Sequence, residues 1–307
     1  MTAIDLTNPI FQDEAKATAH MERDRWPNGV SCPLCGSDNV HKMEGKTQAG
    51  MFLCNDCRDK FTVRTGTVFE RSHIPLHKWL LATHLMAASK KGVSALQLQR
   101  MLGLGSYRSA WFMCHRIREA MTPTGKAGPL GGEGKIVEAD ETYIGGKEAN
   151  KHVHKRNKKN IGGMGKQAVF ALTERDGQSR SFRVAKVSGE TLRPILVSHV
   201  SRKSALMTDQ GGQYFQVGKE FDRHETVNHG ADEYVRGDAH TNTSECRFSL
   251  MKRAVFGAHH SISEAHLPRY LAEWDFKWNT RKVKDGERAA LALKGAEGKR
   301  LTYRQPH

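Results

Sequence analysis

Three carboxylates are the first candidates for chemistry in this chain. Asp140 lies in a segment, residues 137–146, that is otherwise typical of a strand, and Asp209 ends the apolar run 205–208. Burying a carboxylate in a sheet costs several kcal/mol unless a cation or a donor compensates it, so a bound metal explains both positions. Glu245 follows Asp209 after 35 intervening residues and lies at the start of a predicted helix. Two strand-end aspartates and a helical glutamate can converge on two divalent ions about 3.5–4 Å apart.

Each of these acids also has a simpler interpretation. Asp209 alone is equally typical of a turn or a helix cap, and Glu245 alone is typical of a favourable charge in the first turn of a helix. Glu138 shares a strand face with Asp140, and it either lies near the metals or balances the basic interior. Carboxylate oxygens accept both Mg²⁺ and Mn²⁺, so the sequence leaves the ion open. Four further acids compete for the same role: Glu138, Glu141, Asp238 and Glu264.

Four cysteines form a second candidate site, this one for a single metal ion. They make two CxxC pairs with 18 residues between the pairs: Cys32, Cys35, Cys54 and Cys57. This spacing predicts a tetrahedral thiolate site for Zn²⁺. Because sulfur fills all four positions and leaves none for water or substrate, we expect a structural ion rather than a redox or catalytic one. Gly36 supplies the backbone freedom of a metal knuckle, Phe52 and Phe61 supply a small core, and Cys114 and Cys246 are expected to be ordinary helix residues.

The composition favours a soluble, intracellular protein that binds a polyanion. The chain has 48 Lys and Arg against 33 Asp and Glu, a net charge of +15 and a pI near 9.6, which is typical of nucleic-acid binding. The sequence has no apolar run of about 18 residues, and residues 1–20 lack the pattern of a signal peptide. In a reducing compartment, the paired cysteines indicate metal binding rather than disulfides.

Helical periodicity and capping signals predict a DNA-binding module before residue 122. Helices are expected at 12–25, 76–90, 95–102 and 107–121, with Ser94 and Gln97 forming a capping box and Ser106 capping the last helix. Three helices with a tight glycine turn before the last one indicate a helix-turn-helix, and a generic helical bundle between two domains is the alternative. The expected DNA contacts on the last helix are Tyr107, Arg108, Arg116 and Arg118.

The chain from residue 135 onward predicts an α/β domain with a mixed sheet covered by helices. Strands are expected at 135–140, 142–146, 167–174, 179–187, 204–208 and 225–228, and helices at 188–200, 213–220, 243–256 and 263–279. The Asp176-Gly177 turn is a strong hairpin signal between two of these strands. A basic, glycine-interrupted tract at 151–166 is expected to add sequence-independent affinity for DNA. Lys252 and Arg253 lie two helical turns beyond Glu245, and they either contact the phosphates beside the cut or form a solvated helix face. The further expected DNA contacts are therefore Lys155, Arg156, Lys158, Lys159, Lys252 and Arg253.

These motifs together resemble a known family, the DDE insertion-sequence transposases with an N-terminal zinc ribbon. They are similar in particular to the insertion-sequence family numbered fifteen ninety-five. The resemblance covers nearly the whole chain and is carried by the two CxxC pairs and by the segments 140–147, 208–209, 240–245 and 250–253. It implies that Asp140, Asp209 and Glu245 bind the catalytic metals. Asn242 matches a position where some relatives offer an alternative third ligand, and Cys246-Arg247-Phe248 departs mildly from the aromatic-rich stretch that is common there.

The resemblance implies a DNA transposase that cuts insertion-sequence ends and joins them to target DNA by two-metal phosphoryl transfer. Its expected cofactors are structural Zn²⁺ and two catalytic Mg²⁺ or Mn²⁺ ions. Its expected partners are double-stranded DNA, both terminal inverted repeats and target, and further copies of itself when two ends pair, and no membrane. We expect a bacterial protein that is cytoplasmic and nucleoid-associated. The alternatives are a zinc-ribbon DNA-binding regulator derived from an inactive transposase and a ribonuclease-H-type nuclease without strand transfer.

The predicted organisation has six parts, and the fold class is α/β with a ribonuclease-H-like mixed-sheet catalytic domain. The parts are an N-terminal helix and turn (1–29), a zinc ribbon (30–70), a helix-turn-helix-like module (71–122), a linker (123–134), the catalytic domain (135–282) and a basic C-terminal tail (283–307).

Overall fold

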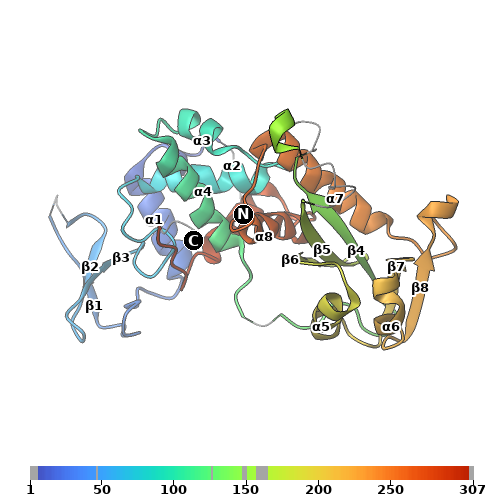
Figure 1. Cartoon of the computed structure of the whole chain (residues 1–307). Coiled ribbons are helices and arrows are strands. Elements are labelled where there is room, and N and C mark those ends of the chain that lie inside the picture. Colours follow the sequence, from blue (N-terminus) through green and yellow to red (C-terminus); the bar gives the residue numbers. More distant parts are fainter. Residues whose placement is uncertain (1–5, 46–47, 126, 147–150, 157–164, 304–307) are drawn as a thin grey trace. The chain divides into compact units, whose positions relative to one another are not determined.

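The computed structural model describes residues 6–45, 48–125, 127–146, 151–156 and 165–303 (Figure 1). The chain forms two compact units. The first unit contains Met1–Pro123 and Lys282–His307, and the second contains Thr124–Arg281. Among the described helices, none has the length and apolar character that crossing a membrane requires.

The first unit combines a small sheet with helices. Its three antiparallel strands are β1 (Val40–Lys42), β2 (Met51–Cys54) and β3 (Lys60–Thr62), in the order β1-β2-β3. Phe52 and Phe61 stack at 5.5 Å on this sheet, and Trp26 packs edge-on against both rings, so the expected aromatic core is present. The helices are α1 (Glu14–Arg25), α2 (Leu76–Ala88), α3 (Ala95–Met101), α4 (Tyr107–Met121) and α9 (Asp285–Lys294).

Two serines begin the helix pair α3 and α4, as their capping signals predict. The Ser94 hydroxyl accepts the Gln97 backbone N–H at 3.1 Å, and the Ser106 hydroxyl accepts the Ser109 N–H at 3.1 Å. Each cap satisfies one of the backbone donors that a helix leaves unpaired at its first turn. Gly103, with φ +58°, makes the turn between the two helices.

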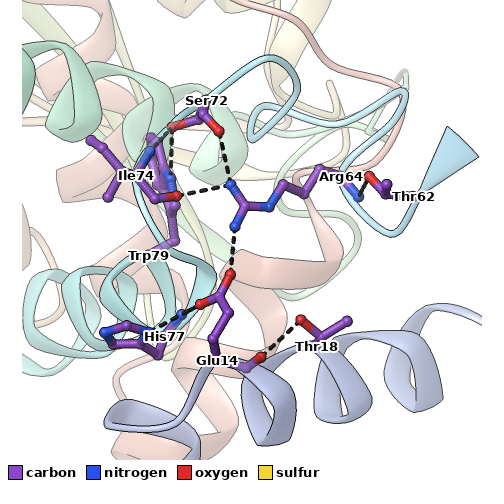
Figure 2. A network of polar contacts seen from close by, with 8 residues as sticks. All are labelled: Glu14, Thr18, Thr62, Arg64, Ser72, Ile74, His77 and Trp79. Carbon is purple, nitrogen blue, oxygen red and sulfur yellow. Dashed lines mark hydrogen bonds and ion pairs between the residues drawn. The ribbon is translucent and has the colours of Figure 1, made fainter. Parts of the chain in front are cut away.

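A polar network joins the sheet to α1 and α2 (Figure 2). Arg64, just after β3, donates to the backbone oxygens of Ser72 (2.9 Å) and Ile74 (2.8 Å) and to the Glu14 carboxylate (2.8 Å). The other Glu14 oxygen accepts the His77 backbone N–H at 3.1 Å. Burial raises the pKa of Glu14, but the N–H groups of Leu76 and His77 and the Arg64 charge outweigh it and lower the pKa. Arg64 is therefore engaged in holding the first unit together.

The C-terminal segment, expected to be a basic tail, contains the helix α9. It packs against α2 and α4, and its Ala289 and Ala292 are buried. Arg288 adds a hydrogen bond to the Ala87 backbone oxygen at 3.3 Å. The small apolar face of α9 is buried because α2 packs against it. The periodicity of the α9 sequence alone does not reveal this distant partner.

The second unit is built on a five-stranded mixed sheet. Its order is β6-β5-β4-β7-β8, in which β4 is antiparallel to β5 and parallel to β7, and β7 is parallel to β8. This arrangement is consistent with the expected ribonuclease-H-like domain. The strands are β4 (Ile136–Ile144), β5 (Gln167–Glu174), β6 (Ser179–Val184), β7 (Ala205–Asp209) and β8 (Arg223–Val227).

Helices cover both faces of this sheet (Figure 1). On one face, Leu192 and Leu196 of α5 and Val217 of α6 pack in one apolar cluster with the sheet. On the other face, Phe248 and Met251 of α7 pack in a second cluster with α8 and the sheet. The helices are α5 (Gly189–His199), α6 (Phe215–Gly218), α7 (Asn242–Ala254), which continues into a π-helical turn (Val255–His259), and α8 (Leu267–Asn279).

Two boundaries differ from the sequence-based expectation. β4 runs without a break through Glu141, where two strands were predicted. The end of the predicted linker belongs to the second unit, because Leu130 is buried and its backbone bonds to His199 (2.7 Å) and Ser201 (2.8 Å). A paired backbone and a buried side chain make this stretch part of the sheet domain rather than a free connection.

Candidate active site and metal centre

Asp140 and Asp209 lie on neighbouring parallel strands at equivalent positions. The pairing of β4 with β7 runs through Glu138 opposite Met207, and each aspartate lies two residues farther along its own strand. Side chains alternate along a strand, so both aspartates lie on the sheet face that carries Glu138 and Met207. The two aspartates therefore lie at equivalent positions just beyond the β4–β7 pairing. Asp209 ends β7 as predicted, whereas Asp140 lies inside β4, which continues to Ile144.

Glu245 reaches the same region from α7, which packs against β4. It lies in the first turn of that helix, where its backbone N–H bonds to Thr241 at 3.0 Å. Its charge is one of those that raise the pKa of Asp140, as is the charge of Asp209. The three predicted acids are thus electrostatic neighbours.

Burial and crowding make Asp140 the most perturbed of the three acids. The pKa of this carboxyl is raised to about 7, mainly by burial and in addition by the charges of Glu141, Asp209 and Glu245. The Glu141 backbone N–H, which donates to Asp140 at 2.7 Å, works in the opposite direction. A divalent cation would remove this repulsion, so the donor set suits a hard ion with oxygen ligands.

Glu138 has a different role from its neighbour Asp140. Its side chain is fully buried and accepts hydrogen bonds from Arg175 (2.8 Å), the Thr243 hydroxyl (2.9 Å) and the Ser244 backbone N–H (2.9 Å). Arg175 also donates to the backbone oxygen of His240 at 2.9 Å. The Glu138 carboxylate balances the charge of Arg175, whose side chain is 18% exposed, and this is the second of its two predicted roles. It also attaches the first turn of α7 to β4.

Glu141 faces the opposite side of β4 from Asp140. It accepts a hydrogen bond from the buried Tyr214 hydroxyl and another from the Gln213 side chain at 2.9 Å. Burial and the Asp209 charge raise the pKa of Glu141, and the Tyr214 hydrogen bond opposes them. Gln213 and Tyr214 lie just after Asp209 in the chain, so Glu141 ties the end of β4 to the turn that follows β7.

The four paired cysteines meet in the first unit. The sulfur of Cys32 lies 3.7 Å from that of Cys57, the sulfur of Cys35 lies 3.6 Å from that of Cys54, and all four sulfurs lie within 4.8 Å of one another. Tetrahedral Zn²⁺ with Zn–S bonds of about 2.3 Å requires sulfurs roughly 3.8 Å apart, so the cluster fits this ion. In the described part of the chain, no other group of three or more His, Cys, Asp or Glu is as compact.

The two cysteine knuckles have the same backbone geometry. Gly36 donates to the Cys32 oxygen at 2.8 Å, and Arg58 donates to the Cys54 oxygen at 3.0 Å. Both residues have positive φ, +80° for Gly36 and +64° for Arg58. The backbone N–H of Cys57 is the main cause that lowers the pKa of Cys54 to about 7.

Comparison with known families agrees with this geometry. A family model described as "ISXO2-like transposase domain" matches residues 129–279, and one described as "Transposase zinc-ribbon domain" matches residues 12–60. The chain therefore carries an ISXO2-like transposase domain and a transposase zinc-ribbon domain. The first match contains Asp140, Asp209 and Glu245, and the second contains the four paired cysteines. The sulfur cluster of this transposase is accordingly a structural zinc site.

A curated relative of this transposase is known from Halobacterium salinarum. It is named "Uncharacterized protein in transposable element ISH50" and is 29% identical over 279 residues. The match covers 87% of this chain and 91% of the relative. The two proteins therefore correspond over nearly their full lengths.

The predicted DNA contacts on α4 divide into exposed and buried side chains. Tyr107, with 52% exposure, and Arg108 are exposed at the start of the helix, and Arg116 is half-buried. Arg118 is a wrong prediction, because its side chain is only 2% exposed and packs inside the first unit. Helical spacing from Arg108 did not separate the outer face from the inner one, since the neighbouring helices decide which face is covered.

Four of the other predicted site residues are exposed in the transposase's second unit: Asn242, Lys252, Arg253 and Arg156. Lys252 and Arg253 are exposed on α7, and Asn242 is exposed on that helix one turn before Glu245. Arg156 follows a short 3₁₀ turn, Val153–Lys155, that includes Lys155. Lys158 and Lys159 lie outside the described residues.

Proposed function

We propose that this transposase cuts the ends of its element and joins them to target DNA at Asp140, Asp209 and Glu245. The observation that carries the proposal is the register of β4 and β7, which puts two aspartates at equivalent positions on one sheet face beside the first turn of α7. The charges of Asp209 and Glu245 raise the pKa of Asp140, and uncompensated carboxylates repel one another, which supports a bound cation among the three acids. Asn242 is the alternative third ligand, because it lies one turn before Glu245 on the same helix.

Bound Mg²⁺ or Mn²⁺ would supply an activated water and charge stabilisation of the leaving oxygen. The protein's part is to hold its carboxylates in place and to position DNA. Glu138 fixes the start of α7 through Thr243 and Ser244, which keeps Glu245 beside β4. Lys252 lies two turns along α7 from Glu245 and is exposed, so it can contact a phosphate beside the cut.

The chemistry is two in-line phosphoryl transfers. Water attacks the phosphorus at the element's end, the bond to the 3′ oxygen breaks, and a free 3′ hydroxyl forms. That hydroxyl then attacks a target phosphodiester, and a target 3′ oxygen leaves. Pairing two ends before transfer requires more than one copy of the chain, so we propose that the active species is a homo-oligomer on double-stranded DNA.

Cleavage and strand transfer by the zinc-loaded protein test this proposal. The substrate is a labelled duplex with the terminal sequence that flanks the gene, with a supercoiled plasmid as target and Mg²⁺ as cofactor. We expect product from the wild type and none from Asp140→Asn, Asp209→Asn or Glu245→Gln. Asp238→Asn is the matched control, because this exposed acid pairs with Arg223, which lies opposite the first residue of β7 whereas Asp209 is the last.

The outcome also separates the alternatives. Cleavage without joined product would indicate a nuclease of ribonuclease-H type. Specific end binding with no cleavage in Mg²⁺ or Mn²⁺ would indicate a DNA-binding regulator. Full activity of Glu245→Gln with loss in Asn242→Ala would transfer the third-ligand role to Asn242.

A further inference from the structure

The last described residues of the chain attach to the C-terminal end of α4. The Lys299 ammonium donates to the backbone oxygens of Glu119 (3.0 Å), Ala120 (3.3 Å) and Thr122. A helix leaves its last carbonyls without intrahelical partners, and a cation there also suits the helix dipole. Lys299 therefore fixes one end of a segment, Lys299–Tyr303, that we call the C-terminal strap.

The other end of the C-terminal strap lies over the first half of α4. The Tyr303 ring packs edge-on against Phe112 at 5.4 Å and Trp111 at 6.2 Å, and the Arg108 guanidinium lies 4.2 Å over the Tyr303 ring centre. Four extended residues reach about 13 Å, and the helix between positions 112 and 120 is about 12 Å long. The strap thus runs along α4 in the direction opposite to the helix.

Two arginines of α4 lie where the C-terminal strap covers this helix. The Arg108 guanidinium lies over the Tyr303 ring and the Arg116 guanidinium lies 4.9 Å over the Phe112 ring, so both groups stack on aromatic rings. Burial, and then the charge of nearby Arg300, lower the pKa of Arg116, and Glu70 partly opposes them. A guanidinium stacked on a ring face keeps its N–H edge available, and that edge matches a phosphate in geometry and charge.

We infer that the C-terminal strap and the exposed half of α4 form one surface for the DNA backbone, in which Tyr303 holds Arg108 ready for a phosphate. The inference rests on the proposed DNA-processing function and extends it to a segment that the sequence indicated only as a tail. The occupant is double-stranded DNA, because the chain has a net charge of +15 and a transposase domain, and a planar, bidentate donor fits a phosphate oxygen pair. Tyr303 is a positioning residue that acts through Arg108.

Fluorescence anisotropy with the full, zinc-loaded chain tests the inference. The probes are a labelled duplex with the element's terminal sequence and a scrambled duplex of the same composition, each titrated at several salt concentrations. We expect Tyr303→Ala to weaken binding to both duplexes about 2- to 5-fold, the range that corresponds to an exposed cation–π contact. Tyr303→Phe should bind as the wild type does, since the ring and not the hydroxyl supports Arg108.

Arg108→Ala should weaken binding about tenfold and reduce the slope of log affinity against log salt by about one, as expected for one lost phosphate contact. The double variant should bind no more weakly than Arg108→Ala alone, because Tyr303 acts through that arginine. Lys294→Ala is the control, since it removes an exposed cation at the end of α9. Zinc content and thermal melting of each variant report on folding.

Three results would overturn the inference. Unchanged binding by a folded Tyr303→Ala variant would show that the strap does not support DNA binding. Tighter binding by that variant would show that the strap covers the surface instead of completing it. A wild type that binds neither duplex would contradict the DNA-processing function itself, a failure that differs visibly from the first two.

Discussion

Replacing Glu138 by Gln should destabilise the second unit and slow DNA cleavage, although Glu138 is not one of the proposed metal ligands. The carboxylate is 0% exposed, and both of its oxygens accept hydrogen bonds from donors. The glutamine amide has the same size but only one acceptor oxygen. At least one of the three donors, from Arg175, Thr243 and Ser244, must therefore face the amide N–H₂ group instead of an acceptor. The partly buried charge of Arg175 also loses its counter-charge.

The expected loss follows from these contacts. A hydrogen bond to a charged group contributes about 1.5–3 kcal/mol, and a buried donor left unpaired costs about 1–3 kcal/mol. Together they predict a loss of roughly 2.5–6 kcal/mol in the free energy of unfolding, a range that includes the loss of about 3–5 kcal/mol measured when one partner of a buried ion pair is removed. Because Thr243 and Ser244 begin α7, its Glu245 should also move, and a displacement of about 1 Å can slow a reaction about 10²-fold.

Urea unfolding, followed by circular dichroism, and the Mg²⁺-dependent cleavage rate measure the two effects. Glu264→Gln is the control, since its side chain is 64% exposed and pairs with Arg183 at the surface, where an ion pair contributes about 0–1 kcal/mol. If Glu138→Gln unfolds at the same urea concentration as Glu264→Gln, the proposed anchoring of α7 is refuted. If it is destabilised but cleaves at the wild-type rate, Glu138 does not place Glu245.

Three further predictions follow from the two sites. The folded state raises the pKa of Asp140 from 3.8 to about 7, so the folded chain keeps a proton that the unfolded chain releases, and stability falls as pH rises from about 4 to 7. In Mg²⁺-free buffer, urea unfolding should therefore show Asp140→Asn to be more stable than the wild type by up to roughly 4 kcal/mol at pH 8 and equal to it at pH 4. Equal stability of the two proteins at both pH values would contradict the raised pKa of Asp140. Arg58→Gly should stabilise the ribbon by roughly 0.5–1 kcal/mol, because glycine adopts the left-handed backbone without strain, and zinc should then survive a higher chelator concentration. Removing zinc with a chelator should shift Trp26 fluorescence to the red, since this ring packs on Phe52 and Phe61 in the ribbon; an unchanged spectrum would mean that the ribbon folds without metal.

Local signals in the sequence were sufficient for much of the fold. The Asp176-Gly177 turn does separate β5 from β6, and Asp176 adopts φ +57° there. The caps at Ser94 and Ser106 begin α3 and α4 at the predicted residues. The cysteine spacing also corresponds to the sulfur cluster. Each of these signals acts over a few residues, which is why a sequence pattern can carry it.

The features that the sequence did not reveal depend on distant partners. Glu138 and Arg175 are 37 positions apart, and the sequence alone could not decide whether this acid lies beside a metal or beside a cation. Arg118 resembles a surface cation until the neighbouring helices bury it. Tyr303 supports Arg108 across most of the chain's length, and its only local signal was an aromatic residue in a basic segment. Burial and pairing are decided by tertiary packing, and local propensity carries little information about them.

Metal-specific rescue tests the central claim most directly. Asp140→Cys and Asp209→Cys replace a carboxylate by a sulfur, which Mg²⁺ accepts poorly and Mn²⁺ accepts more readily. If these residues hold the catalytic ions, both variants should be inactive in Mg²⁺ and regain cleavage and strand transfer in Mn²⁺, while the control Glu141→Cys, beside Tyr214 on the other face of β4, should show no such recovery. Variants that bind DNA as the wild type does but stay inactive in both metals, or that are active in Mg²⁺, would contradict direct metal coordination by Asp140 and Asp209.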